Sequence, residues 1–171
     1  AGLASQYVDG LQGQTQQGVL LPSARGYDKA LATLKHYAAN NSEVNRRSGS
    51  SDMDQRTLRE YYTAQFRDII QQAHPASIMS SYNEVNGVPA AASVQLMDTL
   101  ARETFGFTGY FTSDCDAIRE IQNSHHWQPP GYPHPLDQYE RHASGHDRRP
   151  EQQERRVEDR VGIHLHLQLD R

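Results

Sequence analysis

Three short polar strings in the sequence carry side chains that are suited to chemistry. Each follows an apolar run: Lys35-His36 after the first, Tyr82-Asn83 after the second and Asp114 after the third. A carboxylate such as Asp114 at the end of a strand can attack an electrophilic carbon, bind a metal, accept a phosphate or cap the next turn. Lys35 and His36 can bind a polar ligand, or they can be a surface lysine and a hydrogen-bonded imidazole. The residues alone leave these alternatives open.

The segments between these strings alternate between two hydrophobic patterns. Short apolar runs bounded by polar loops predict strands, whereas Leu58, Phe66 and Ile70 belong to a set of apolar residues at helical spacing. The predicted elements are, in chain order, a strand over residues 27–37, a helix over 53–72, a strand over 76–82, a helix that starts at Ser93 and stops at Gly106, and a strand over 109–113. Residues 40–51 and 83–90 are expected to be loops.

Capping residues define the ends of the two predicted helices. Asp52, with Gln55 three residues later, has the form of an N-cap and its partner. Pro75 is expected to end the first helix, because proline disfavours helical geometry in the residue before it. Ser93 can cap the second helix, and Gly106 suits its C-terminal stop.

The order strand, helix, strand, helix, strand predicts parallel strands that are joined by helical crossovers. Two α/β architectures have this order, the (β/α)8 barrel and the doubly wound sheet. In both of them, ligands bind at the carboxyl ends of the strands. We therefore expect the three polar strings to converge on one face. Lys35 and His36 are adjacent, so both reach that face only if their strand bends at its end.

Length, charge and hydropathy limit the classes of protein to consider. The chain has 171 residues, fewer than the ~250 of a typical closed (β/α)8 barrel. A net charge of −4 and an isoelectric point near 6.1 give no basic surface for nucleic acid. No apolar run approaches the ~20 residues that cross a bilayer. We expect neither a nucleic-acid partner nor a membrane, and the single Cys115 excludes an intrachain disulfide.

Three longer strings surround the polar positions. They are Lys35-His36-Tyr37-Ala38-Ala39-Asn40-Asn41-Ser42-Glu43-Val44-Asn45-Arg46, then Ile78-Met79-Ser80-Ser81-Tyr82-Asn83 with Asn86-Gly87-Val88-Pro89, and then Gly106-Phe107-Thr108-Gly109-Tyr110 with Ser113-Asp114. Together they resemble glycoside hydrolase family 3, the family of the β-glucosidases and β-xylosidases. The resemblance runs from residue 1 to residue 116 and more weakly to residue 141. It implies an α/β fold, part of a (β/α)8-like barrel with parallel strands.

The resemblance also implies roles for individual side chains. Asp114 matches the nucleophile of the family's Ser-Asp motif. Substrate contacts are implied for Lys35, His36, Arg46, Met79 and Tyr82, with Arg47 as the neighbouring alternative to Arg46. A Lys35 ammonium or an Arg46 guanidinium near Asp114 would favour the ionised carboxylate.

The implied reaction is hydrolysis of a terminal β-linked glucose or xylose by retaining double displacement, in which a second carboxylate acts as acid and then as base. The substrate is a β-linked oligosaccharide or an aryl β-glycoside. The resemblance implies no metal and no organic cofactor. Cys115-Asp116 is similar to the xylosidase-like branch of the family.

Two departures from the family pattern concern completeness. Family members carry the acid/base glutamate in a domain that follows the barrel, and further sugar-binding residues upstream of the Lys-His motif. Residues 1–141 are therefore interpreted as a fragment of the N-terminal barrel domain, with impaired activity. Residues 142–171 contain six Arg, four His and no aromatic residue, which indicates a charged tail that a truncation or frame shift could have produced.

Other interpretations stay open. The chain could be an inactive remnant that binds sugar, or a barrel lyase that uses Lys35 as a Schiff-base amine. Residues 125–135 are predicted to form a proline-rich loop, with Trp127 near the acceptor sugar. The adjacent His125 and His126 are not expected to chelate one ion, and the alternating His164 and His166 are not expected to bind metal.

Overall fold

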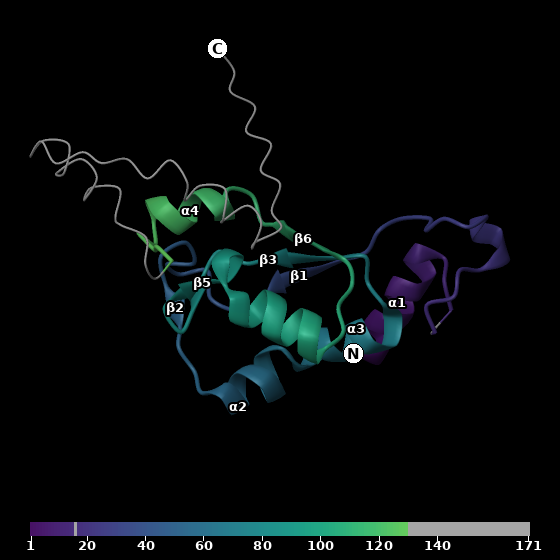
Figure 1. Ribbon diagram of the computed structural model, residues 1–171, viewed down its shortest axis with the longest axis horizontal. Coiled ribbons are helices and arrows are strands. Elements are labelled where there is room, and N and C mark those ends of the chain that lie inside the picture. The colour runs from purple at the N-terminus through teal and green to yellow at the C-terminus, as the bar shows by residue number, and fades with distance from the viewer. Residues whose placement is uncertain (16, 130–171) are drawn as a thin grey trace, which may run out of the picture. The chain divides into compact units, whose positions relative to one another are not determined.

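The structure, a computed structural model, describes residues 1–15 and 17–129 (Figure 1). The predictions for the charged tail, for His164 and His166, and for the chain beyond residue 129 therefore lie outside the described residues. The described elements are α1 (Gly2–Gln12), η1 (Pro22–Ala24), β1 (Thr33–Tyr37), β2 (Ser50–Ser51), α2 (Gln55–Thr57), η2 (Leu58–Tyr62), α3 (Ala64–Ala73), β3 (Ser77–Ser80), β4 (Glu84–Val85), β5 (Val88–Pro89), η3 (Ala90–Ala92), η4 (Gln95–Thr104), β6 (Tyr110–Ser113) and α4 (Ala117–Asn123). In this part of the chain, no helix is long and apolar enough to cross a membrane.

The central sheet is parallel, with the strand order β1-β3-β6. Ser77 pairs with Thr33 on one side and with Tyr110 on the other, so the three strands start level with one another. Figure 1 shows these strands side by side. Gly109 precedes β6 where a Cβ atom would collide with the carbonyl oxygen of Ala76, which explains a glycine at this position. The predicted α/β class and the three parallel strands are confirmed.

The first strand is shorter than the sequence predicts. β1 begins at Thr33, whereas the prediction began at residue 27, because Tyr27 and Leu31 are apolar but exposed. The register of β1 against β3 is irregular between Leu34 and Tyr37. The pairing of β1 is therefore irregular around Lys35 and His36, but their burial still alternates, with Lys35 exposed and His36 half-buried.

The first crossover is one helical segment built from α2, η2 and α3. Its N-cap is Asp54, whose Oδ1 accepts a hydrogen bond from the Thr57 N–H at 2.7 Å. The predicted cap at Asp52 is wrong, because the first turn begins at Gln55 and Asp52 accepts instead from the Ser50 hydroxyl. α3 ends at His74 in a left-handed conformation before Pro75, as predicted.

The second crossover is η4, a helical segment with π-type turns. The Ser93 hydroxyl accepts a hydrogen bond from the Leu96 N–H at 3.2 Å, which confirms the predicted cap. Gly106 follows the helix with φ of 82° and donates its N–H to the Arg102 carbonyl, which confirms the predicted stop. The core lies between the central sheet and the crossover helices and includes Tyr37, Leu58, Phe66, Ile70, Ile78, Leu96, Leu100 and Phe107.

A second, small sheet forms within the two segments that the sequence predicts as loops. β2 pairs in parallel with β4, and β4 pairs with β5 as an antiparallel hairpin. The hairpin turn is Asn86-Gly87, both with positive φ, which suits a two-residue turn. This sheet joins the segment after β1 to the segment after β3, so it fixes two of the loops that follow the central strands.

Candidate active site

The carboxyl ends of the three central strands bring His36 and Asp114 into contact. His36 Nε2 lies 3.0 Å from Asp114 Oδ2, and the two side chains are 31% and 17% exposed. The other oxygen, Asp114 Oδ1, accepts a hydrogen bond from the Cys115 N–H at 2.7 Å. The Asp114 N–H donates to the Ser80 carbonyl and so anchors the residue to β3. The Cys115 N–H thus orients one oxygen of the carboxylate, the His36 ring contacts the other, and the group is still accessible to a ligand.

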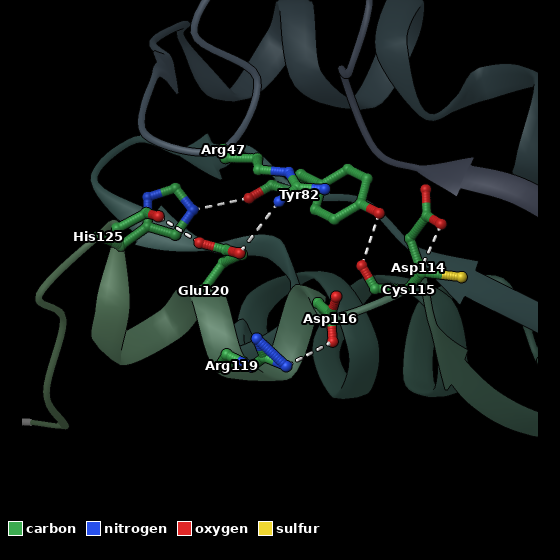
Figure 2. Close-up of polar contacts among 9 residues, drawn as sticks. Arg47, Tyr82, Asp114, Cys115, Asp116, Arg119, Glu120 and His125 are labelled. Atoms are coloured by element: carbon green, nitrogen blue, oxygen red, sulfur yellow. Dashed lines mark hydrogen bonds and ion pairs between the residues drawn. The ribbon is translucent and has the colours of Figure 1, made fainter.

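Tyr82 packs beside this carboxylate. Its side chain is buried, and its hydroxyl donates to the Cys115 carbonyl at 2.6 Å (Figure 2). Burial, together with the negative charge of Asp114, raises the pKa of the Tyr82 phenol. The phenol therefore stays protonated at neutral pH and donates its hydrogen bond to the residue that follows Asp114.

Two arginines from the loop after β1 lie against the Tyr82 ring. The guanidinium carbons of Arg46 and Arg47 are 4.8 Å and 5.1 Å from the ring centroid, within the range of cation–π contacts. Arg46 also pairs with the exposed Glu43 at 3.0 Å, whereas Arg47 Nη1 lies 3.4 Å from Oε1 of Glu120. The candidate sugar-binding Arg46 is therefore held next to Tyr82.

The remaining predicted site residues are less closely connected. Lys35 lies on β1 and is exposed, and Met79 lies on β3 and is half-buried opposite Thr112. In the described part of the chain, neither side chain has a polar contact with Asp114. The groups next to the carboxylate are the His36 ring and a main-chain N–H, rather than the Lys35 ammonium that the sequence suggests. An exposed Lys35 also lacks the apolar surroundings that suit a Schiff-base amine.

Sequence reasoning missed α4 and two side chains near its end. Glu120 contacts Arg47 and Ser124, and His125 Nε2 lies 2.7 Å from the Tyr82 carbonyl oxygen (Figure 2). The sequence predicts a loop at His125 and gives this residue no role, whereas in the structure its ring is buried. Arg47 is 73 residues from Glu120, and Tyr82 is 43 residues from His125, so no local pattern indicates either of these contacts. Among the described residues, no group of three or more His, Cys, Asp or Glu side chains could hold a metal ion.

Comparison with known proteins decides the family. Residues 1–130 match the N-terminal domain of glycosyl hydrolase family 3. The chain belongs to glycosyl hydrolase family 3. A probable exo-1,4-β-xylosidase of Aspergillus niger is 41% identical over 128 residues, which are 71% of this chain and 15% of that protein. A β-glucosidase of Rhizobium radiobacter is 39% identical over 114 residues, which are 67% of this chain and 12% of that protein.

Solved structures of family 3 enzymes share the fold. A family 3 exo-β-xylosidase in complex with a xylobiose aziridine activity-based probe matches with a TM-score of 0.62 and 37% identity, over 71% of this chain and 16% of that one. β-Glucosidase 3B of Thermotoga neapolitana in complex with glucose matches with a TM-score of 0.57 and 28% identity, over 84% of this chain and 20% of that one. The resemblance read from the sequence is thus confirmed at the level of family and fold. The family 3 chain spans about 15% of the length of the curated relatives that it matches.

Proposed function

We propose that this chain forms the nucleophile and sugar-binding part of a retaining β-glycosidase that removes terminal β-linked xylose or glucose. The observation that supports this most directly is the environment of Asp114. Its carboxylate lies at the carboxyl end of β6, with His36 Nε2 at 3.0 Å from one oxygen and the Cys115 N–H at 2.7 Å from the other. One main-chain hydrogen bond and the contact with the His36 ring orient the carboxylate, and its remaining exposure leaves room for a sugar.

In the proposed reaction, an Asp114 oxygen attacks the anomeric carbon and the bond to the leaving-group oxygen breaks. The leaving oxygen takes a proton from an acid, and a covalent glycosyl ester of Asp114 remains. Water then attacks the same carbon, the base takes its proton, and the carboxylate is released. We assign the acid/base role to no residue between 1 and 129. Glycosides whose leaving group needs no protonation therefore test the role of Asp114 without requiring an acid.

The sugar would be held by groups at the same strand ends. We propose His36, Arg46 and Lys35 as donors to the ring hydroxyls, since cationic and imidazole N–H groups form strong hydrogen bonds to oxygen. Tyr82 would form one wall of the site and Met79 would border it. The relatives named exo-β-xylosidase and β-glucosidase both support a terminal β-linked sugar as the substrate.

The test is turnover of 2,4-dinitrophenyl β-xyloside and β-glucoside, whose leaving group departs without a proton. We expect the full chain to release dinitrophenolate and Asp114→Asn to lower that rate by at least about a hundredfold. Asp116→Asn is the matched control, because Asp116 is an exposed carboxylate two residues away that pairs with Arg119 at 3.3 Å. Equal rates for the wild type and Asp114→Asn would refute the proposal.

One alternative is a chain that binds sugar without turnover, because the side chains at the strand ends could hold a sugar even if Asp114 does not attack it. Calorimetric titration with xylose and with glucose separates the two. Heat of binding without release of dinitrophenolate would support the alternative, and absence of both would exclude either role.

A further inference from the structure

The polar groups that contact Tyr82 come from the loop after β1, from Cys115 and from His125, which follows α4. Tyr82 has three kinds of contact: its hydroxyl to the Cys115 carbonyl, its ring to Arg46 and Arg47, and its own carbonyl to His125. It also packs against Ala91 and Ala117 in a small apolar cluster with Ile118 and Ile121. Two of these contacts lead to α4 by separate routes, through the ring and through the main chain.

The first route runs through Glu120. Its side chain is only 9% exposed, and its Oε1 lies 3.4 Å from Arg47 Nη1 while Oε2 accepts from the Ser124 hydroxyl. A buried carboxylate is stable only when it is paired, so this pairing holds Arg47 in place. Arg47 in turn lies against the Tyr82 ring at 5.1 Å. Arg47 is therefore engaged, whereas the ion pair of Arg46 within residues 1–129 is with the exposed Glu43.

The second route runs through His125. Its side chain is 1% exposed. Its Nε2 lies 2.7 Å from the Tyr82 carbonyl oxygen, which can only accept, so Nε2 carries the proton and donates. On the other side of the ring, Nδ1 lies 3.2 Å from Glu84 Oε1, too oblique for a hydrogen bond. The contact by which His125 holds Tyr82 is therefore the Nε2 hydrogen bond.

We propose that Glu120 and His125 are positioning residues for the sugar site. Glu120 holds Arg47 against the Tyr82 ring, and His125 fixes the Tyr82 main chain. The ring and the Arg46 guanidinium on it are thereby kept beside Asp114, with Arg46 as the arginine that is available to the sugar. The sugar ligand in this inference comes from the proposed function. The position of Tyr82 can be measured in the protein without any sugar.

The experiment uses the full chain with tyrosine labelled with ¹³C at Cζ, and Tyr82→Phe assigns the Tyr82 signal. The variants are Glu120→Gln and His125→Leu. His125→Gln is the conservative variant, because its amide can donate where Nε2 does. Gln122→Ala is the matched control, an exposed side chain on the same helix. Each protein is titrated with D-xylose and D-glucose, and its thermal unfolding is recorded.

We expect Glu120→Gln and His125→Leu to shift the Tyr82 signal and to raise the Kd for the sugar about fivefold, the effect of losing one hydrogen bond. His125→Gln should restore the signal, and Gln122→Ala should match the wild type. An unchanged Tyr82 signal in both folded variants, even with lower thermal stability, would overturn the inference. A wild type that binds neither sugar, with a Tyr82 signal that moves only in the two variants, would refute the proposed function and leave the positioning of Tyr82 intact.

Discussion

Gln12 should be a large determinant of stability, because it joins the amino ends of two strands to the end of a helix. It is the last residue of α1 and is 2% exposed. Its Oε1 accepts from the Ala32 N–H at 3.2 Å and from the Ala76 N–H at 2.9 Å, and its Nε2 donates to the His74 carbonyl at 3.2 Å. Ala32 and Ala76 directly precede β1 and β3. Gln12 therefore sets the relative position of the strands whose opposite ends lead to the candidate active site.

The change Gln12→Leu keeps a side chain of similar volume and removes all three hydrogen bonds. Ala32 is buried, at 4% exposure, so its N–H would have no water to replace the lost partner, which costs about 1–3 kcal/mol. The groups on Ala76 and His74 are nearer to solvent, so each should cost about 0.5–1 kcal/mol. We expect a total loss of about 3 kcal/mol, a large share of the about 5–15 kcal/mol that stabilises a typical domain.

Urea unfolding of the full chain, followed by far-ultraviolet circular dichroism, measures this loss. The control is Gln71→Leu, an equivalent change at an exposed position on α3. The midpoint should fall for Gln12→Leu at an unchanged m value, and should stay near that of the wild type for Gln71→Leu. A loss below about 1 kcal/mol for Gln12→Leu, or the same loss in both variants, would refute the reasoning.

Two further predictions concern carboxylates. Both Asp9 oxygens are buried without a hydrogen-bond partner in the described structure, and burial raises the pKa of Asp9 against the opposing charge of His74. Because the pKa is raised in the folded state, ionisation of Asp9 destabilises the fold as the pH rises above the ordinary value of 3.8. Asp9→Asn should therefore increase the free energy of unfolding by about 1 kcal/mol at pH 7 and by almost nothing at pH 3.5. An equal gain in urea unfolding at both pH values would contradict this. For the cap, Asp54→Ala should lower the Tm more than Asp52→Ala. Because the hydrogen bond from Thr57 lowers the pKa of Asp54, the difference should shrink as the pH falls below 3.8. Equal Tm values for the two variants at pH 7 would contradict Asp54 as the cap.

Local patterns were sufficient to predict the crossover units. The second helix was predicted with both its cap and its stop, because Ser93 and Gly106 act on N–H and carbonyl groups within four residues. The predicted cap of the first helix is wrong because Asp52 and Asp54 are both good acceptors. Which of them caps the helix depends only on where the first free N–H groups of the helix lie. Such near-neighbour choices depend on the backbone rather than on residue type.

The elements that the sequence did not reveal depend on contacts between distant residues. α1 buries Ser5, Asp9 and Gln12 together with Val8, while Leu3 and Tyr7 are exposed, so its buried face is mostly polar and lacks the apolar stripe of an ordinary amphipathic helix. The predicted strand ends did bring His36 and Asp114 together, since parallel strands place their carboxyl ends on one edge. The contacts of α4 with Tyr82 and Arg47 required the structure.

Covalent labelling tests whether Asp114 is the nucleophile of a retaining glycosidase. The reagents are 2-deoxy-2-fluoro-β-xylosyl fluoride and its glucosyl counterpart, in which fluoride leaves as the Asp114 oxygen bonds to the anomeric carbon. Fluoride needs little protonation, so an acid/base residue is not required, and the 2-fluoro group slows release of the ester. We expect the wild-type chain to gain one fluoroglycosyl group, which mass spectrometry should locate on the peptide that contains Asp114. The same group should be absent from Asp114→Asn. No adduct with either reagent, or equal labelling of Asp114→Asn, would contradict Asp114 as the nucleophile.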